Sequence, residues 1–117
     1  MVIDDDQAVR NSLKFSLEVE GFTVRIYATG AELLSAADLA LSSCFVVDQN
    51  MPGMNGLDLI GLLRARHLSA PAILITSHPG TPLRARAQAA GVPIVEKPLL
   101  GHVLLDKIRD LVGVTPS

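Results

Sequence analysis

Residues 44–59, "CFVVDQNMPGMNGLDL", are the stretch that decides the fold. The apolar run 44–47 is typical of a buried strand, and it ends in the carboxylate of Asp48. A Met-Pro-Gly turn follows, and the pattern of a helix begins at residue 56. Burying a charge is costly unless something compensates for it, so Asp48 is either a cap or part of a site.

The same order of strand and then helix recurs along the whole chain. The β-branched runs are "MVI", "FTVRIY", "CFVV", "AILIT" and "PIVE", and the helical patterns cover 7–20, 30–41, 56–67, 82–90 and 99–112. Such alternation demands a parallel sheet with helices on both faces and right-handed crossovers. We therefore predict a doubly wound α/β fold, as one domain over residues 1–117.

Residues that favour helix ends support these limits. They are Asp6 as a cap, Thr29 with Glu32, Asn55 with Asp58, Pro82 in a first turn, and Gly91 after a helix. The first strand looks clipped, because only residues 1–3 precede the first acidic cluster. The last residues, "GVTPS", are equally compatible with a natural end and with a linker to an output domain.

Composition excludes several classes of protein. With 10 basic and 12 acidic side chains, three Phe, one Tyr and no Trp, nothing indicates a nucleic-acid surface on this domain. Apolar residues make up 49% of the chain, but charges and Gly or Pro interrupt every run, so we expect no membrane span and no signal peptide. The single cysteine, Cys44, is expected to be a small core residue, and a cytoplasmic location is the natural expectation.

Polar side chains gather where the predicted strands end. In an open parallel sheet, ligands bind beyond the carboxyl ends of the strands. These ends carry Asp4, Asp5 and Asp6; Asp48; Thr76 and Ser77; and Glu96, Lys97 and Pro98. Crowded carboxylates repel one another unless a cation lies between them, and Mg²⁺ prefers oxygen ligands. Asp5 and Asp48 suit such an ion, and a carboxylate can also attack a phosphoryl group while Lys97 holds its oxygens.

Four ordered motifs, "VIDDD", "VVDQNMPGMNGLDL", "ILITS" and "VEKP", resemble those of the receiver domain of bacterial two-component response regulators. The resemblance covers essentially the whole chain, and the stretch that begins at Asp48 is its most specific part. It implies a flavodoxin-like (βα)5 three-layer sandwich with a five-stranded parallel sheet in the order 2-1-3-4-5.

The resemblance also implies roles for individual residues. Asp48 would be the phosphoacceptor, and Thr76 and Lys97 would contact its phosphoryl group. The magnesium ligands would be Asp5, Asp48, the backbone carbonyl of Asn50 and, through water, Asp4. The bond between Lys97 and Pro98 would be cis, as is usual in the family. The implied partners are a sensor histidine kinase or phosphotransfer protein and an output domain, and the implied catalysis is limited to the domain's own phosphorylation and dephosphorylation.

The chain departs from the family at one position. Receivers usually carry Tyr or Phe three residues before the lysine, whereas this chain has Ile94, and Pro93 enters the last strand. An interaction module that signals without phosphorylation is therefore an alternative, while a separate phosphatase is disfavoured because no Gly-rich phosphate loop follows the first strand.

Two further expectations concern the surface. The helix with Arg84, Arg86 and Gln88 and the last helix form the face that we expect to dimerise or to bind partners. We expect no metal role for His67, His78 or His102, because they have no ligand spacing.

Overall fold

The computed structural model describes residues 1–36, 39, 42–68, 70–97 and 103–112, and it confirms the doubly wound α/β fold. The strands are β1 (Val2–Ile3), β2 (Ile26–Tyr27), β3 (Phe45–Asp48), β4 (Ala72–Thr76) and β5 (Ile94–Glu96). The helices are α1 (Gln7–Val19), α2 (Gly30–Leu34), α3 (Gly56–Ala65), α4 (Thr81–Ala89) and α5 (Val103–Val112). All pairings are parallel, in the order β2-β1-β3-β4-β5.

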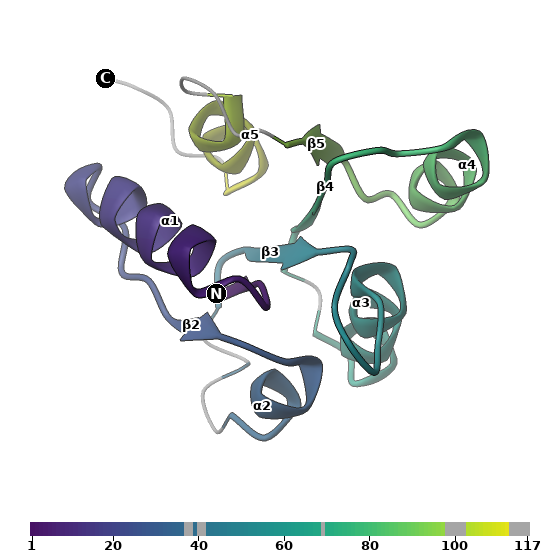
Figure 1. The fold of residues 1–117 in the computed structure, drawn as a ribbon, viewed down its shortest axis with the longest axis horizontal. Helices are drawn as coiled ribbons and strands as arrows, with labels where there is room; N and C mark the ends of the chain where they lie inside the picture. The colour runs from purple at the N-terminus through teal and green to yellow at the C-terminus, as the bar shows by residue number, and fades with distance from the viewer. Residues whose placement is uncertain (37–38, 40–41, 69, 98–102, 113–117) are drawn as a thin grey trace.

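Helices cover both faces of this sheet, as Figure 1 shows, with α1 and α5 on one side and α2, α3 and α4 on the other. Because successive side chains of a strand point to opposite faces, each central strand contributes to two cores. Val2, Val46 and Ile75 pack with residues of α1 and α5. Ile3 and Leu74 instead pack with residues of α2, α3 and α4. Strands buried on both faces account for the unbroken apolar runs in the sequence.

The predicted helix boundaries hold for the first, third and fourth helices. Asp6 caps α1 by accepting the N–H groups of Ala8 and Val9, and Asn55 accepts the N–H of Asp58 at the start of α3. Gly91 follows α4 with φ of +70°, the left-handed conformation that glycine adopts at helix ends without penalty. The predicted start of the last helix and the predicted cis bond before Pro98 lie outside the described residues.

Two predicted elements are too long. The second helix was expected over 30–41, but α2 ends at Leu34. The hydroxyl of Ser35 donates to the carbonyl of Ala31 alongside the Ser35 N–H, a side-chain bond that is unfavourable in helix interiors. The second strand was expected over 22–27, but only Ile26 and Tyr27 pair with β1. Pairing is limited by β1, which consists of two residues.

Helix α4 is attached differently from its neighbours. It buries Ala87, whereas α3 buries Gly56, Leu57, Leu59, Ile60 and Leu63. Its other described contacts include two exposed ion pairs, Arg84 with Glu96 of β5 at 2.6 Å and Arg86 with Asp58 of α3 at 3.2 Å. The packing of α4 therefore depends more on charge and less on apolar burial than that of α3.

No helix in the described part of the chain has both the length and the apolar character needed to cross a membrane.

Candidate functional site

Asp48 is the last residue of β3, and its side chain is buried at the carboxyl edge of the sheet, with 2% of its surface exposed. It pairs with Ile75 of β4, so it lies in the middle of the sheet rather than at a side. Its Oδ1 accepts the backbone N–H of Asn50 at 3.2 Å. The strand thus presents one carboxylate at the carboxyl edge of the sheet, near the middle strands, where ligands bind in this class of fold.

Asp4 follows β1, which lies next to β3, and it is completely buried. Its Oδ1 accepts the N–H of Asp6 at 2.9 Å, while its Oδ2 is a buried oxygen that accepts no hydrogen bond. Asp5 is exposed beside it. The first acidic cluster therefore supplies one buried and one accessible carboxylate.

Lys97 follows β5 and joins these carboxylates. Its backbone N–H donates to the carbonyl of Thr76 at 2.9 Å, which extends the pairing of β4 and β5 by one residue. Its Nζ lies 3.3 Å from Oδ2 of Asp4 and 3.4 Å from Oδ1 of Asp48. Three residues that are far apart in the sequence are thus brought together as one charged group.

Burial and neighbouring charges shift the pKa values of Asp48 and Lys97. Burial raises the pKa of Asp48 to about 6; the N–H of Asn50 and the ammonium of Lys97 oppose that rise, while the charge of Asp4 adds to it. Burial works to lower the pKa of Lys97, but attraction by Asp48 and Asp4 outweighs it, and the pKa lies above its ordinary value. Lys97 is therefore positively charged at neutral pH, and it only partly compensates the buried carboxylates.

The remaining imbalance fits a divalent cation. One oxygen from each of Asp4, Asp5 and Asp48 lies within 4.8 Å of the other two. Three carboxylates and one ammonium leave a formal charge of −2, and the buried Oδ2 of Asp4 has its ion pair with Lys97 but accepts no well-formed hydrogen bond. Carboxylate oxygens are the ligands that Mg²⁺ prefers. The residues present therefore suit this ion.

Two other predicted site residues, Thr76 and Asn50, lie at the same edge. Thr76 is the last residue of β4, and its side chain is buried. Asn50 is exposed in the loop after β3. Ile94, at the position where the family usually has an aromatic residue, is half-buried and packs against the core on the side of α2, α3 and α4. The roles predicted for Asn50 and Thr76 stay predictions, because no ligand is present to report on them.

Three contributions to this site were not predicted from the sequence. The Arg10 guanidinium donates to the carbonyl of Asp4 at 2.7 Å, a contact that no local pattern indicates. A Cβ on Gly56 would clash with the carbonyl group of Asp48, so the start of α3 lies directly against the backbone of Asp48. The glycine in the predicted motif was the available signal for this close approach. The third is Gln49, whose side-chain carbonyl accepts the N–H of Leu57.

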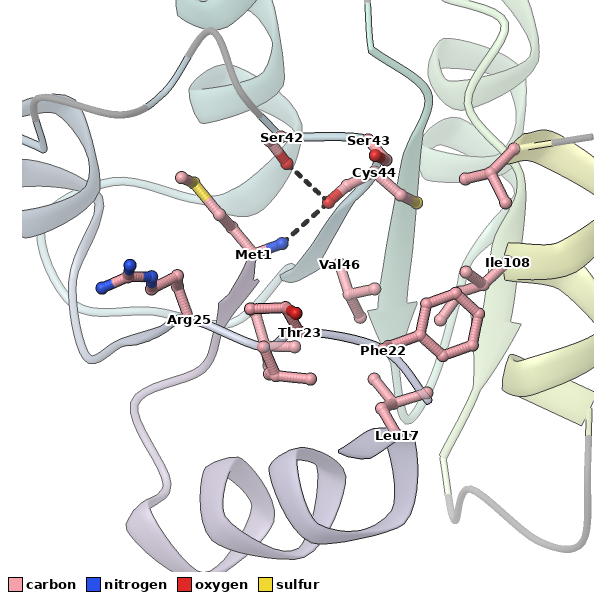
Figure 2. Close-up of a pocket in the computed structure, with 13 residues that line it drawn as sticks. Met1, Leu17, Phe22, Thr23, Arg25, Ser42, Ser43, Cys44, Val46 and Ile108 are labelled. Atoms are coloured by element: carbon pink, nitrogen blue, oxygen red, sulfur yellow. Dashed lines mark hydrogen bonds between the residues drawn. The ribbon is translucent and has the colours of Figure 1, made fainter. Parts of the chain in front are cut away.

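A separate cavity of about 320 Å³ lies at the opposite edge of the sheet, near the amino ends of the strands. Figure 2 shows Leu17, Phe22, Val46 and Ile108 around it, with Ser42 and the Met1 amino group both donating to the carbonyl of Cys44. Burial raises the pKa of the Cys44 thiol to about 11, so the thiol stays protonated and unreactive. The cavity is apolar in character and is not part of the acidic site.

A doubly wound parallel sheet with clustered carboxylates and a lysine at its carboxyl edge is an arrangement suited to a divalent cation and to an anionic ligand. The response regulator receiver domain family matches residues 1–109 of the chain. The chain therefore belongs to this family, and it is a receiver domain of the two-component response regulators.

Similar sequences are regulators of transcription. The transcriptional regulatory protein FixJ of Azorhizobium caulinodans is 37% identical over 113 residues, which cover 96% of this chain and 54% of FixJ. The C4-dicarboxylate transport transcriptional regulatory protein DctR of Rhodobacter capsulatus is 36% identical, over 90% of this chain and 55% of DctR. The chain spans about half the length of these relatives.

Solved structures share the fold. The response regulator StyR has a TM-score of 0.87 at 33% identity, over 97% of this chain and 58% of that one. FixJ-N has a TM-score of 0.78 at 30% identity, over 99% and 94% of the two chains. The chemotaxis protein CheY4 of Vibrio cholerae, at 24% identity over 94% of each chain, has a TM-score of 0.86 and supports the fold alone.

Proposed function

We propose that this chain is a phospho-accepting receiver in which Asp48 takes a phosphoryl group from a sensor histidine kinase or phosphotransfer protein. The observation that carries the proposal is the placement of Lys97, whose Nζ lies 3.3 Å and 3.4 Å from the carboxylates of Asp4 and Asp48. An ammonium in this position can bind the oxygens of a phosphoryl group next to the nucleophile.

The residues divide the chemistry among them. An oxygen of Asp48 attacks the phosphorus in line with the leaving group, an O–P bond forms, and the bond between phosphorus and the imidazole nitrogen of the donor breaks. Asp5, Asp48, the carbonyl of Asn50 and, through water, Asp4 would hold Mg²⁺, which would supply charge neutralisation for the phosphoryl oxygens. Lys97 binds one of these oxygens, and the hydroxyl of Thr76, at the end of β4, binds another. The domain acts only on its own phosphorylation and dephosphorylation.

Phosphorylation changes the surface through which the domain contacts its partners. The family and the longer relatives support an output domain as one of them. The face of α4 and α5 is the proposed surface for that contact or for a homodimer, and we propose no direct contact of this domain with nucleic acid or membrane. A cytoplasmic location belongs to the same proposal, supported by the relatives that regulate transcription.

Mass spectrometry of the intact protein tests the central step. After incubation with Mg²⁺ and acetyl phosphate, we expect an increase equal to one phosphoryl group, which is absent when chelator replaces Mg²⁺. The Asp48→Asn variant should show no increase, whereas Asp58→Asn, an exposed carboxylate on α3, should react as the parent does. An unmodified parent would favour the alternative, an interaction module that signals without phosphorylation.

A further inference from the structure

Gln49, the residue after the proposed phosphoacceptor, joins three elements of the site. Its backbone N–H donates to the carbonyl of Ile75 in β4 at 2.9 Å. Its backbone carbonyl accepts the N–H of Gly56 at 3.1 Å, and its side-chain Oε1 accepts the N–H of Leu57 at 2.9 Å. One half-buried residue therefore connects the end of β3 with both β4 and the start of α3.

These contacts satisfy groups that a helix leaves without partners. The first N–H groups of a helix have no carbonyl within the helix to bond, so other groups must accept them. In α3 the first two are accepted by Gln49, and the third, on Asp58, is accepted by Asn55. Two of the three capping bonds thus depend on one residue, and one of those two depends on its side chain.

The contacts of Gln49 with β4 and α3 also fix the two ends of the loop 50–55, which begins after Gln49 and ends before Gly56. Asn50 follows Gln49 directly, and its N–H donates to the carboxylate of Asp48. Within the loop, Met51 and Met54 pack against the core on the side of α2, α3 and α4. A rotation of the peptide between residues 49 and 50 would move the Asn50 N–H and shift the Asn50 carbonyl that follows it. The bonds from Gly56 to the Gln49 carbonyl and from Leu57 to the Gln49 side chain oppose such a rotation.

We propose that Gln49 is a positioning residue, which holds the loop 50–55 in place so that the carbonyl of Asn50 is directed toward Mg²⁺ before the ion binds. The inference rests on the proposed function, since it assigns a role within that metal site. When a binding loop must be ordered by its ligand, part of the binding free energy is spent on the ordering and affinity falls. Removing the side-chain acceptor should therefore weaken Mg²⁺ binding although every ligand atom remains.

Three variants separate this role from a general loss of stability. Gln49→Met keeps the length of the side chain and removes its hydrogen-bond acceptor, whereas Gln49→Glu keeps an acceptor oxygen. Thr29→Ala is the matched control, because it removes a comparable capping bond from α2, between Thr29 Oγ1 and the N–H of Glu32 at 3.1 Å. Each is compared with the parent by amide hydrogen exchange without metal, by Mg²⁺ titration followed by NMR, and by labelling with acetyl phosphate.

We expect Gln49→Met to raise the Mg²⁺ dissociation constant about fivefold, which corresponds to one hydrogen bond of ordinary strength. Amide exchange at Leu57 and Asn50 should become about tenfold faster in the metal-free variant, because the local opening costs less free energy. Labelling should slow at low Mg²⁺ and recover at saturating Mg²⁺. Gln49→Glu should keep slow exchange at Leu57 and bind Mg²⁺ no more weakly than the parent. Thr29→Ala should lose stability with no change in Mg²⁺ affinity.

If Gln49→Met binds Mg²⁺ with the same dissociation constant as the parent, the inference is overturned, whether or not the amides of the variant exchange faster. Unchanged exchange at Leu57 would overturn it as well, since the bond would then not hold the loop. These results differ from a failure of the proposed function, in which the parent itself neither binds Mg²⁺ nor accepts a phosphoryl group and the role of Gln49 falls with it.

Discussion

The substitution Asp48→Asn should stabilise the metal-free protein at neutral pH, although it removes the residue on which the proposed function depends. In the folded protein Asp48 is buried beside Asp4, and the ammonium of Lys97 is shared between the two carboxylates. Asparagine keeps the shape of the side chain and an oxygen for the N–H of Asn50, but it carries no charge. The change therefore removes repulsion and desolvation while it retains the packing.

The size of the effect follows from the pKa of Asp48, which rises from 3.8 to about 6 on folding. Since each pKa unit corresponds to about 1.4 kcal/mol, ionisation of Asp48 lowers the free energy of unfolding by about 3 kcal/mol at pH 7. The folded state binds the proton more tightly than the unfolded state, so this loss develops as pH rises from about 4 to about 6. Asp48→Asn should be close to the parent below pH 4 and up to about 3 kcal/mol more stable above pH 6.

Urea unfolding followed by circular dichroism, between pH 4 and pH 8 in chelator, measures this difference. Asp110→Asn, which removes an exposed carboxylate of α5, should keep the pH dependence of the parent. Adding Mg²⁺ should raise the stability of the parent much more than that of Asp48→Asn, because the ion favours the ionised carboxylate. A variant that is less stable than the parent at pH 7, or that has the same pH dependence, would refute the reasoning.

Four further substitutions test other parts of the structure. Lys97→Met should lower the free energy of unfolding at pH 7 by about 2 kcal/mol in chelator, because the buried carboxylates lose their ammonium partner. The loss should be smaller at pH 4.5, where Asp48 is protonated, and an equal loss at both pH values would contradict this. Gly56→Ala should lower the free energy of unfolding by about 3 kcal/mol, because the new Cβ would lie 2.9 Å from the carbonyl carbon of Asp48. Gly61→Ala in the same helix meets open space and should raise the free energy of unfolding by about 0.5 kcal/mol. Similar urea midpoints for the two variants would contradict this. His67→Gly should stabilise by about 1 kcal/mol, because His67 has φ of +61° after α3, and a lower thermal midpoint would argue against strain there.

The sequence was sufficient to predict the sheet and the location of the site. Periodicity identified the order of strands and helices, and the rule for parallel sheets placed Asp4, Asp48 and Lys97 at one edge, as the structure shows. The arrangement 2-1-3-4-5 came from the resemblance, because no local pattern states which strands pair. Sequence alone could not give the end of α2, where the hydroxyl and the N–H of Ser35 share one helical carbonyl.

The details within the site were also beyond the sequence. The contact of Arg10 with the carbonyl of Asp4, and the two carbonyls of Gln49 at the start of α3, depend on side-chain rotamers and on the angle of a loop. Nothing in the spacing of residues fixes these quantities. The direction in which the pKa of Asp48 moves likewise depends on how completely β3 and its neighbours bury the carboxylate, which a pattern does not measure.

The ion pairs that attach α4 imply that salt affects the local stability of some helices of the domain more than that of others. Exposed ion pairs such as Arg84 with Glu96 and Arg86 with Asp58 are screened by salt, whereas the apolar contacts of α3 are not. Added salt should therefore lower the free energy of local unfolding of α4 while α3 keeps its own. Glu96 is also the neighbour of Lys97 in the chain, so one of the two ion pairs that attach α4 lies one residue from the lysine of the acidic site. We therefore expect a free-energy change at the site to alter the surface of α4 at a lower cost than that of α3.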